Sequence, residues 1–230
     1  MTYWIFKSTV LLALRLWFRP KVEGMRNLPD GPAIIASNHL SFSDSFFLGA
    51  IVSRRLTFLA KSSYFTTPGL KGRLMARLFR GLGQLAVDRD GGSSTGTALQ
   101  AAVQVLRQGG LLGIYPEGTR SPDGRLYRGR MGVARIALAA GVPVVPVAMI
   151  GTERIQPPGA IVPKMAPLTI RIGAALDFSH YRGAERDRAA LRSVTDEIMS
   201  ELRRLSGQEY VDTYSPGPHR RGNPGPDQSG

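Results

Sequence analysis

Short apolar runs alternate with helix-forming stretches along most of this 230-residue chain. The runs have the length of buried strands, and they cover residues 33–36, 56–60, 84–87, 111–115, 144–150 and 168–172. The helical stretches cover residues 45–53, 69–80, 95–108, 130–140 and 185–205. Strands that alternate with helices in this way are typical of a parallel sheet with helices on both faces. We therefore predict a single α/β domain with a mostly parallel central sheet flanked by helices.

The N-terminal apolar stretch, residues 4–18, is interrupted by Lys7 and Arg15 and is shorter than the roughly 20 residues of a transmembrane helix. On a helical wheel, about one third of the circumference holds the polar side chains, and the large aromatic ones lie outside that arc. The polar set is Lys7, Ser8, Arg15 and Arg19, and the aromatic set is Trp4, Phe6 and Trp17. We predict an amphipathic membrane-surface helix over residues 1–20, which makes the chain monotopic. The alternatives are a helix that packs on the domain and a secretory signal, which would need an early positive charge and an A-x-A site.

The C-terminal end has the composition of a disordered segment. From Ser215 to Gly230 it contains Pro, Gly and polar residues without an apolar anchor. We therefore expect a globular domain over residues 21–210 and a disordered tail over residues 211–230.

The formal net charge of +13 predicts an anionic partner, for which membrane lipid and nucleic acid are the candidates. The chain has no helix-turn-helix, zinc-finger or ribonucleoprotein-type motif, so we expect no nucleic acid. The chain has no cysteine, which excludes disulfides and thiolate nucleophiles. Its three histidines, at positions 39, 180 and 219, lack the spacing of metal ligands, so we also expect no bound metal.

A histidine and an aspartate, His39 and Asp44, follow the apolar run 33–36 directly. Histidine is the usual general base near neutral pH, and a carboxylate on one ring nitrogen fixes the tautomer that leaves the other nitrogen free. A spacing of five residues does not suit one helix face, so the pair must meet across a bend. The plain alternative is that Asp44 only caps the following helix and His39 is a loop residue.

A second polar group follows the run 111–115, in the sequence Pro-Glu-Gly-Thr-Arg-Ser. In open α/β sheets, ligands bind where strands end, so Glu117, Gly118, Thr119 and Arg120 should lie at the same edge as His39. Glycine permits close backbone approach, and arginine offers a forked donor for phosphate. Two further cations, Lys61 and Arg89, also follow predicted strands. The alternative is an ordinary turn with a surface ion pair.

Residues 92–96 match the G-x-S-x-G pattern of serine hydrolases, with Ser94 as the nucleophile. However, residues 88–91 separate this pattern from the preceding strand, and the only later histidines are His180 and His219. We expect these serines to cap the helix that begins near Thr95 instead.

Four motifs together resemble the glycerophospholipid acyltransferase family, and most of all its bacterial 1-acylglycerol-3-phosphate acyltransferases. They are Asn38-His39 with Asp44, Val87-Asp88-Arg89, Tyr115 to Ser121, and Val142 to Val147. The resemblance implies transfer of an acyl chain from a coenzyme A or acyl-carrier-protein thioester to lysophosphatidic acid, without a cofactor. It also implies a domain docked on anionic lipids at the cytoplasmic face of the cell membrane. The chain departs from the family at Tyr115, where phenylalanine is frequent, and in its shortened second motif.

By the same resemblance, His39 would be the base and Asp44 would stabilise the imidazolium. Arg120 with Lys61 and Arg89 would hold the acceptor phosphate, and Glu117 would position either the glycerol hydroxyl or the loop. Pro143 and Pro146 would shape the acyl pocket or a turn, or would simply belong to a buried strand. The alternatives are an acyltransferase for another lysophospholipid or hydroxylated lipid and, more remotely, a non-catalytic basic membrane-surface protein.

Overall fold

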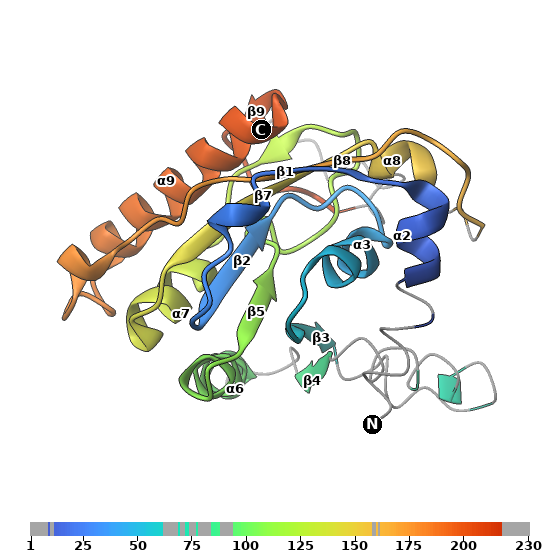
Figure 1. Cartoon of the computed structure of the whole chain (residues 1–230). Helices are drawn as coiled ribbons and strands as arrows, with labels where there is room; N and C mark the ends of the chain where they lie inside the picture. Colours follow the sequence, from blue (N-terminus) through green and yellow to red (C-terminus); the bar gives the residue numbers. More distant parts are fainter. Residues whose placement is uncertain are drawn as a thin grey trace, which may run out of the picture.

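A seven-stranded sheet forms the centre of the computed structural model, with strand order β1-β8-β7-β2-β5-β3-β4 (Figure 1). The structure describes residues 12–61, 84–87, 94–157, 160 and 162–217, with isolated positions at 9, 69, 72, 73 and 77. The strands are β1 Lys21–Glu23, β2 Ala33–Ser37, β3 Leu56–Lys61, β4 Leu85–Val87, β5 Leu111–Ile114, β7 Val144–Ile150 and β8 Thr169–Ile172.

The direction of the strands confirms the predicted sheet. Strands β4, β3, β5, β2 and β7 are parallel neighbours. Strand β8 runs antiparallel to β7, and β1 pairs in parallel with β8. The mostly parallel α/β fold predicted from the alternation of apolar runs is therefore correct.

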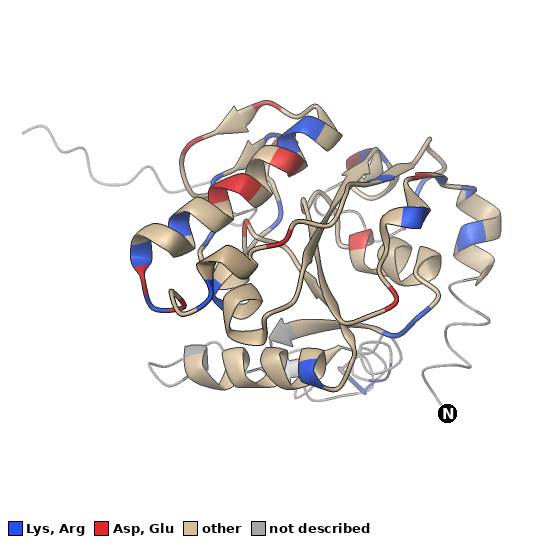
Figure 2. Cartoon of the chain, turned by 60° about the vertical axis from the view of Figure 1, so that its left-hand side comes forward, with Lys and Arg blue, Asp and Glu red and all other residues tan. Residues whose placement is uncertain are grey.

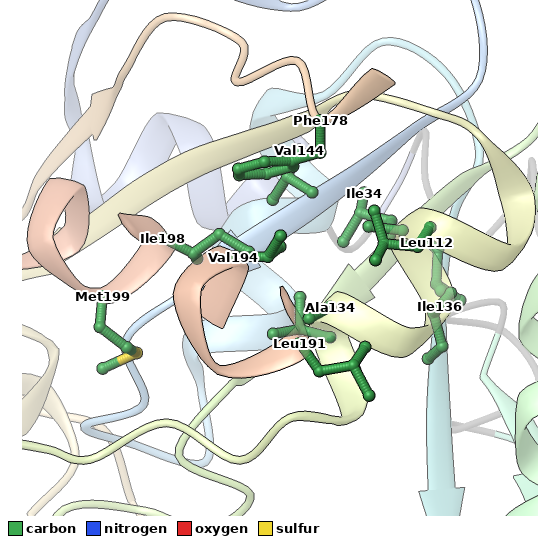
Figure 3. Packing of buried hydrophobic residues seen from close by; sticks show 14 of the residues in the cluster. Ile34, Leu112, Ala134, Ile136, Val144, Phe178, Leu191, Val194, Ile198 and Met199 are labelled. Atoms are coloured by element: carbon green, nitrogen blue, oxygen red, sulfur yellow. The ribbon is translucent and has the colours of Figure 1, made fainter. Parts of the chain in front are cut away.

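Helices cover both faces of the sheet. On one face lie α6 Ser94–Arg107, α7 Gly132–Ala140 and α9 Arg188–Ser206, and on the other lie α3 Asp44–Ile51 and the short α8 Thr152–Ile155. Strand β2 shows why both layers are needed, because Ile34 and Ala36 enter the first core while Ala33 and Ile35 enter the second. Figure 3 shows Ile34 and Val144 of the sheet near Val194 and Ile198 of α9.

Apart from Thr9, the described part of the predicted helix 1–20 begins with α2, Leu12–Phe18. Phe18 joins this helix to α3 through an edge-to-face contact with Phe47, with ring centroids 5.2 Å apart. Within the residues that the structure describes, no helix combines the length and apolarity needed to cross a bilayer.

Three short strands were missed by the sequence analysis, and one predicted helix lies mostly outside the described residues. The short strands β1, β6 Leu126–Tyr127 and β9 Tyr210–Val211 were not predicted, because two or three residues carry too little periodicity. Most of the predicted helix 69–80 falls outside the described residues.

The disordered tail predicted over residues 211–230 begins too early. Val211 lies in β9, which pairs in parallel with β6, and Ser215 is buried. Composition alone missed this segment because backbone pairing, which does not need apolar side chains, holds it in place. Residues 218–230 lie outside the described part of the chain.

Candidate active site

His39 and Asp44 form a hydrogen-bonded pair at the carboxyl end of β2. The distance from His39 Nδ1 to Asp44 Oδ2 is 2.9 Å. Donation from Nδ1 to the carboxylate is the arrangement that leaves Nε2 unprotonated as a base. The His39 side chain is 18% exposed and that of Asp44 is fully buried. The imidazole is therefore reachable from outside while its carboxylate partner is shielded from water.

Asp44 holds the loop that precedes its helix. Its Oδ2 accepts hydrogen bonds from the backbone N–H groups of Leu40 and Ser41, both at 2.8 Å, in addition to the bond with His39. An N-cap side chain would instead accept from N–H groups of the first helical turn. The N-cap position of α3 belongs to Ser43, which makes no such side-chain bond. Asp44 is thus more than a cap, since its carboxylate fixes both the loop and the histidine ring.

Tyr115 supports the other side of the imidazole. Its ring is stacked on His39 with centroids 3.8 Å apart and planes 11° apart, and its hydroxyl lies 2.8 Å from Ser45 Oγ. Burial and the nearby Asp44 carboxylate raise the pKa of Tyr115 well above its ordinary value. The ring therefore stays neutral and acts as a flat support for the base.

Glu117 connects the loop after β5 to the backbone of His39. Its Oε1 accepts from the N–H of His39 at 3.1 Å, and its Oε2 accepts from the N–H of Tyr127 at 2.9 Å. The carbonyl of His39 in turn accepts from the N–H of Ser121 at 2.8 Å. Burial raises the pKa of Glu117 to about 7, although the two backbone N–H groups favour its ionised form. These contacts match the loop-positioning role among the two roles expected for Glu117.

The turn that contains Glu117 is closed by the N–H of Gly118, which donates to the carbonyl of Tyr115 at 2.9 Å. Gly118 has φ 75°, and a Cβ there would lie 2.9 Å from Arg130 Cδ, so the Arg130 side chain lies directly across this glycine. Thr119 faces Gly217 from the C-terminal segment, where a Cβ on the glycine would lie 3.3 Å from Thr119 Oγ1. Within the described part of the chain, the half-buried Arg120 guanidinium makes no hydrogen bond or ion pair, which leaves its donors available to a ligand.

The two other predicted phosphate ligands, Lys61 and Arg89, fall partly or wholly outside the described residues. Strand β3 ends at Lys61, and its register with β5 and β4 brings its carboxyl end to the edge that carries His39. The Lys61 side chain and the whole of Arg89 lie outside the described residues. Their roles in phosphate binding stay predictions.

Pro143 and Pro146 lie at and within β7. The carbonyl of Pro143 accepts from the N–H of Ile34, and that of Pro146 accepts from the N–H of Gly173. The Pro146 ring packs closely on Gly173, where a Cβ would approach Pro146 Cγ to 2.9 Å. Pro146 has the contacts of a buried strand residue, whereas the half-buried Pro143 precedes the strand, and a role of either in an acyl pocket stays a prediction. Helix α6 begins at Ser94, next to the start predicted near Thr95.

Comparison with known proteins identifies the family. The sequence pattern of the acyltransferase family matches residues 19–150, more than half of the chain. The chain belongs to the acyltransferase family. The matched range contains the His39–Asp44 pair, the loop after β5 and most of the sheet.

The relatives of this acyltransferase-family chain have one activity in their names. It is 32% identical over 160 residues to the chloroplastic 1-acyl-sn-glycerol-3-phosphate acyltransferase LPAT1 of Arabidopsis thaliana, covering 69% of this chain and 43% of that protein. It is 27% identical over 194 residues to the Bacillus subtilis 1-acyl-sn-glycerol-3-phosphate acyltransferase, covering 82% and 88%. The crystal structure of the 1-acyl-sn-glycerophosphate acyltransferase PlsC from Thermotoga maritima superposes with a TM-score of 0.63 at 26% identity, covering 87% and 81%. The chain spans less than half the length of the plant relatives it matches.

Sequence reasoning named Asn38 in the first motif but assigned no role to it in ordering the acyltransferase site. Asn38 Nδ2 donates to the carbonyl of Met149 at 2.9 Å and to Gln208 Oε1 at 2.7 Å, and Asn38 Oδ1 accepts from the N–H of Met149 at 2.7 Å. The amide therefore fastens the end of β2 to β7 and to the segment after α9. A polar side chain directly after a fully buried strand must find partners, and that was the available signal.

Proposed function

We propose that this chain is a 1-acyl-sn-glycerol-3-phosphate acyltransferase. It transfers an acyl chain from a coenzyme A or acyl-carrier-protein thioester to the 2-hydroxyl of lysophosphatidic acid and so makes phosphatidic acid. The observation that carries the proposal is the 2.9 Å bond between His39 Nδ1 and Asp44 Oδ2, on a loop tied by Glu117 to the segment that presents Arg120. The names of the relatives support the choice of acceptor.

The reaction needs a base and an oriented hydroxyl. His39 Nε2 takes the proton of the acceptor hydroxyl as its oxygen attacks the thioester carbonyl. The new C–O bond forms, the C–S bond breaks, and the proton passes from the imidazolium to the departing thiolate. Asp44 stabilises the imidazolium during this exchange, and a base of this kind contributes about 10²- to 10⁴-fold in rate.

Phosphate binding orients the acceptor. Arg120 offers charged donors that are not used within the described residues, and we propose that it holds the phosphate with Lys61 and Arg89. Binding energy from the phosphate then fixes the hydroxyl near Nε2. The side chains and the two substrates supply all the groups in this scheme, so we propose that the enzyme requires neither a metal nor a cofactor.

We further propose that α2 docks the enzyme on anionic lipids at the cytoplasmic face of the cell membrane. Leu12, Leu16 and Trp17 are 50%, 64% and 69% exposed, although each is large and apolar. Arg15 lies on the same helix, and lysine and arginine are distributed over many elements of the molecule (Figure 2). An apolar face beside basic residues suits a surface of anionic headgroups.

The loop before β8 extends this surface. Val162 and Met165 are 74% and 64% exposed, and Lys164 lies between them. The N–H of Lys21, shortly after α2, donates to the carbonyl of Leu168 at the end of this loop. Figure 1 shows α2 and α8 on the same side of the molecule. Because Ser41 Oγ donates to the carbonyl of Gln156 at the start of the loop, this surface adjoins the loop of His39.

The test is transfer of a labelled acyl group from acyl-coenzyme A to lysophosphatidic acid in mixed micelles. We expect His39→Ala to lower kcat by about 10²- to 10⁴-fold. Arg120→Ala should mainly raise the acceptor KM, by about 10- to 100-fold, because it removes charge-assisted hydrogen bonds. His180→Ala and Arg186→Ala, at exposed positions away from the site, are the matched controls.

Each alternative predicts a different result. Preference for another lysophospholipid in a competition assay would change the acceptor and leave the reaction in place. Transfer only from acyl-carrier protein would decide the donor. No transfer with either donor, together with salt-sensitive vesicle binding that His39→Ala leaves intact, would favour a non-catalytic membrane-surface protein.

A further inference from the structure

The last described stretch of the chain, residues 208–217, runs from α9 across the loops that hold His39; we call it the C-terminal strap. Gly207, with φ 72°, ends α9 and turns the chain. Gln208 then bonds in two directions, because its Oε1 accepts from Asn38 Nδ2 at 2.7 Å and its Nε2 donates to the carbonyl of Gly124 at 2.6 Å. The strap is therefore tied to the end of β2 and to the loop after β5.

The strap continues along the other side of that loop. Strand β9 pairs in parallel with β6, and the N–H of Arg128 lies within hydrogen-bond distance of the carbonyls of Val211 and Thr213. Tyr214 is the next residue of the strap, and its ring lies beside two arginines. The guanidinium carbons of Arg128 and Arg130 lie 5.8 Å and 5.1 Å from the centre of this one ring. One aromatic side chain thus holds two cations by cation–π contacts.

Arg130 lies against the loop of Arg120, and both arginines keep side-chain donors that no hydrogen bond within the described residues uses. Arg128 forms an ion pair with the exposed Asp212, although the 3.6 Å between Arg128 Nε and Asp212 Oδ1 is too long for a hydrogen bond. In the part of the chain that the structure describes, the exposed Arg130 guanidinium forms no ion pair. The Arg130 side chain crosses Gly118, and its N–H donates to the carbonyl of Pro116 at 2.8 Å.

We infer that the C-terminal strap is part of the acceptor site, in which Tyr214 positions Arg128 and Arg130 to bind, together with Arg120, the phosphate monoester of the acceptor. The inference rests on the proposed function for the identity of the acceptor. Guanidinium groups held near one ring repel each other, and a doubly charged phosphate relieves that repulsion and satisfies their donors. Tyr214 is a positioning residue, because it acts through the two arginines.

The experiment measures binding of sn-glycerol 3-phosphate to the full-length protein by calorimetry, alongside acceptor KM and kcat. Each exposed cation–π contact changes an equilibrium by about 2- to 5-fold and Tyr214 makes two of them, so Tyr214→Ala should raise the Kd for glycerol phosphate and the acceptor KM by about 4- to 25-fold. The value of kcat should change by less than about twofold, since the chemistry at His39 is untouched. Tyr214→Phe keeps the ring and should recover most of the affinity.

Affinity in Tyr214→Ala equal to that of the unaltered protein would overturn the inference, as would a failure of the unaltered protein to bind glycerol phosphate. Arg130→Gln provides a second test on an exposed side chain, in case Tyr214→Ala does not fold. It must also weaken binding, and retained affinity would overturn the inference. If glycerol phosphate binds in a Tyr214-dependent way but no acyl transfer occurs, the strap site stands and only the proposed reaction fails.

Discussion

The replacement Glu117→Gln should change how the stability of the protein depends on pH. Burial raises the pKa of Glu117 from its ordinary value near 4.5 to about 7. The folded state therefore binds this proton more tightly than the unfolded chain does. The free energy of unfolding contributed by Glu117 falls as pH rises from 4.5 to about 7, and it is level above that. At 1.36 kcal/mol per pKa unit, the total change is roughly 3 kcal/mol.

Glutamine removes this titration and keeps much of the shape. Its amide oxygen can accept from one of the two backbone N–H groups, of His39 or of Tyr127, and the other N–H loses its partner. A buried N–H without a partner costs about 1 to 3 kcal/mol, whereas the buried negative charge disappears. Above pH 7 the two effects largely offset each other, so the variant should still fold.

Urea unfolding of both proteins at several values between about pH 4.5 and 8 is the assay. Other titrating groups are common to both proteins, so the difference between the two curves isolates Glu117. The advantage of the unaltered protein over Glu117→Gln should shrink by roughly 3 kcal/mol across the window. Glu197→Gln, on an exposed position of α9, is the control. Parallel curves for the unaltered protein and Glu117→Gln would refute the argument that burial holds this carboxyl partly protonated near neutrality.

Three further changes test the site and the docking surface. Asp44→Asn should fold, because its one amide oxygen can keep the three accepted hydrogen bonds and the other carboxylate oxygen has no partner within the described residues. The variant should lower kcat by about 10²-fold, and Asp44→Ala should lower kcat further. Tyr115→Leu removes the ring stacked on His39 and should lower kcat by about 2- to 10-fold, while Tyr115→Phe should retain more activity. Trp17→Asp should weaken binding to vesicles containing phosphatidylglycerol by about tenfold, measured by co-sedimentation against Ser193→Asp, and equal binding would contradict docking through α2.

The core of the fold could be predicted because each major element carries a long and self-consistent pattern. The runs predicted at 33–36, 111–115 and 144–150 became β2, β5 and β7, and their alternate side chains fill two different cores. Strands β1, β6 and β9 were missed because their stability comes from pairing with distant segments rather than from their own composition. A local pattern carries no information about such partners.

The candidate site also has contacts that could be predicted from the sequence and contacts that could not. The bond between His39 and Asp44 could be predicted because a base and its orienting carboxylate must meet, and one bend after β2 is enough to bring them together. The stacking of Tyr115 and the two bonds of Glu117 could not be predicted in detail, since they depend on the register between β2 and β5. That register places Ala36 beside Ile114, so the residues that follow the two strands emerge side by side.

Because of this register, Glu117 should affect catalysis through the two hydrogen bonds that it accepts and not only through its charge. Its two oxygens join the backbone of His39 to the N–H of Tyr127 in β6, the strand that pairs with the C-terminal strap. One oxygen of the buried Glu117 carboxylate therefore holds the backbone of the base, and the other holds the strand that precedes the arginines near Tyr214. A change that loosens Glu117 should disturb proton transfer and phosphate binding together, whereas changes at Asp44 or Tyr214 should each disturb one of them. Comparing kcat and acceptor KM across these three positions separates the shared support from the two functions it serves.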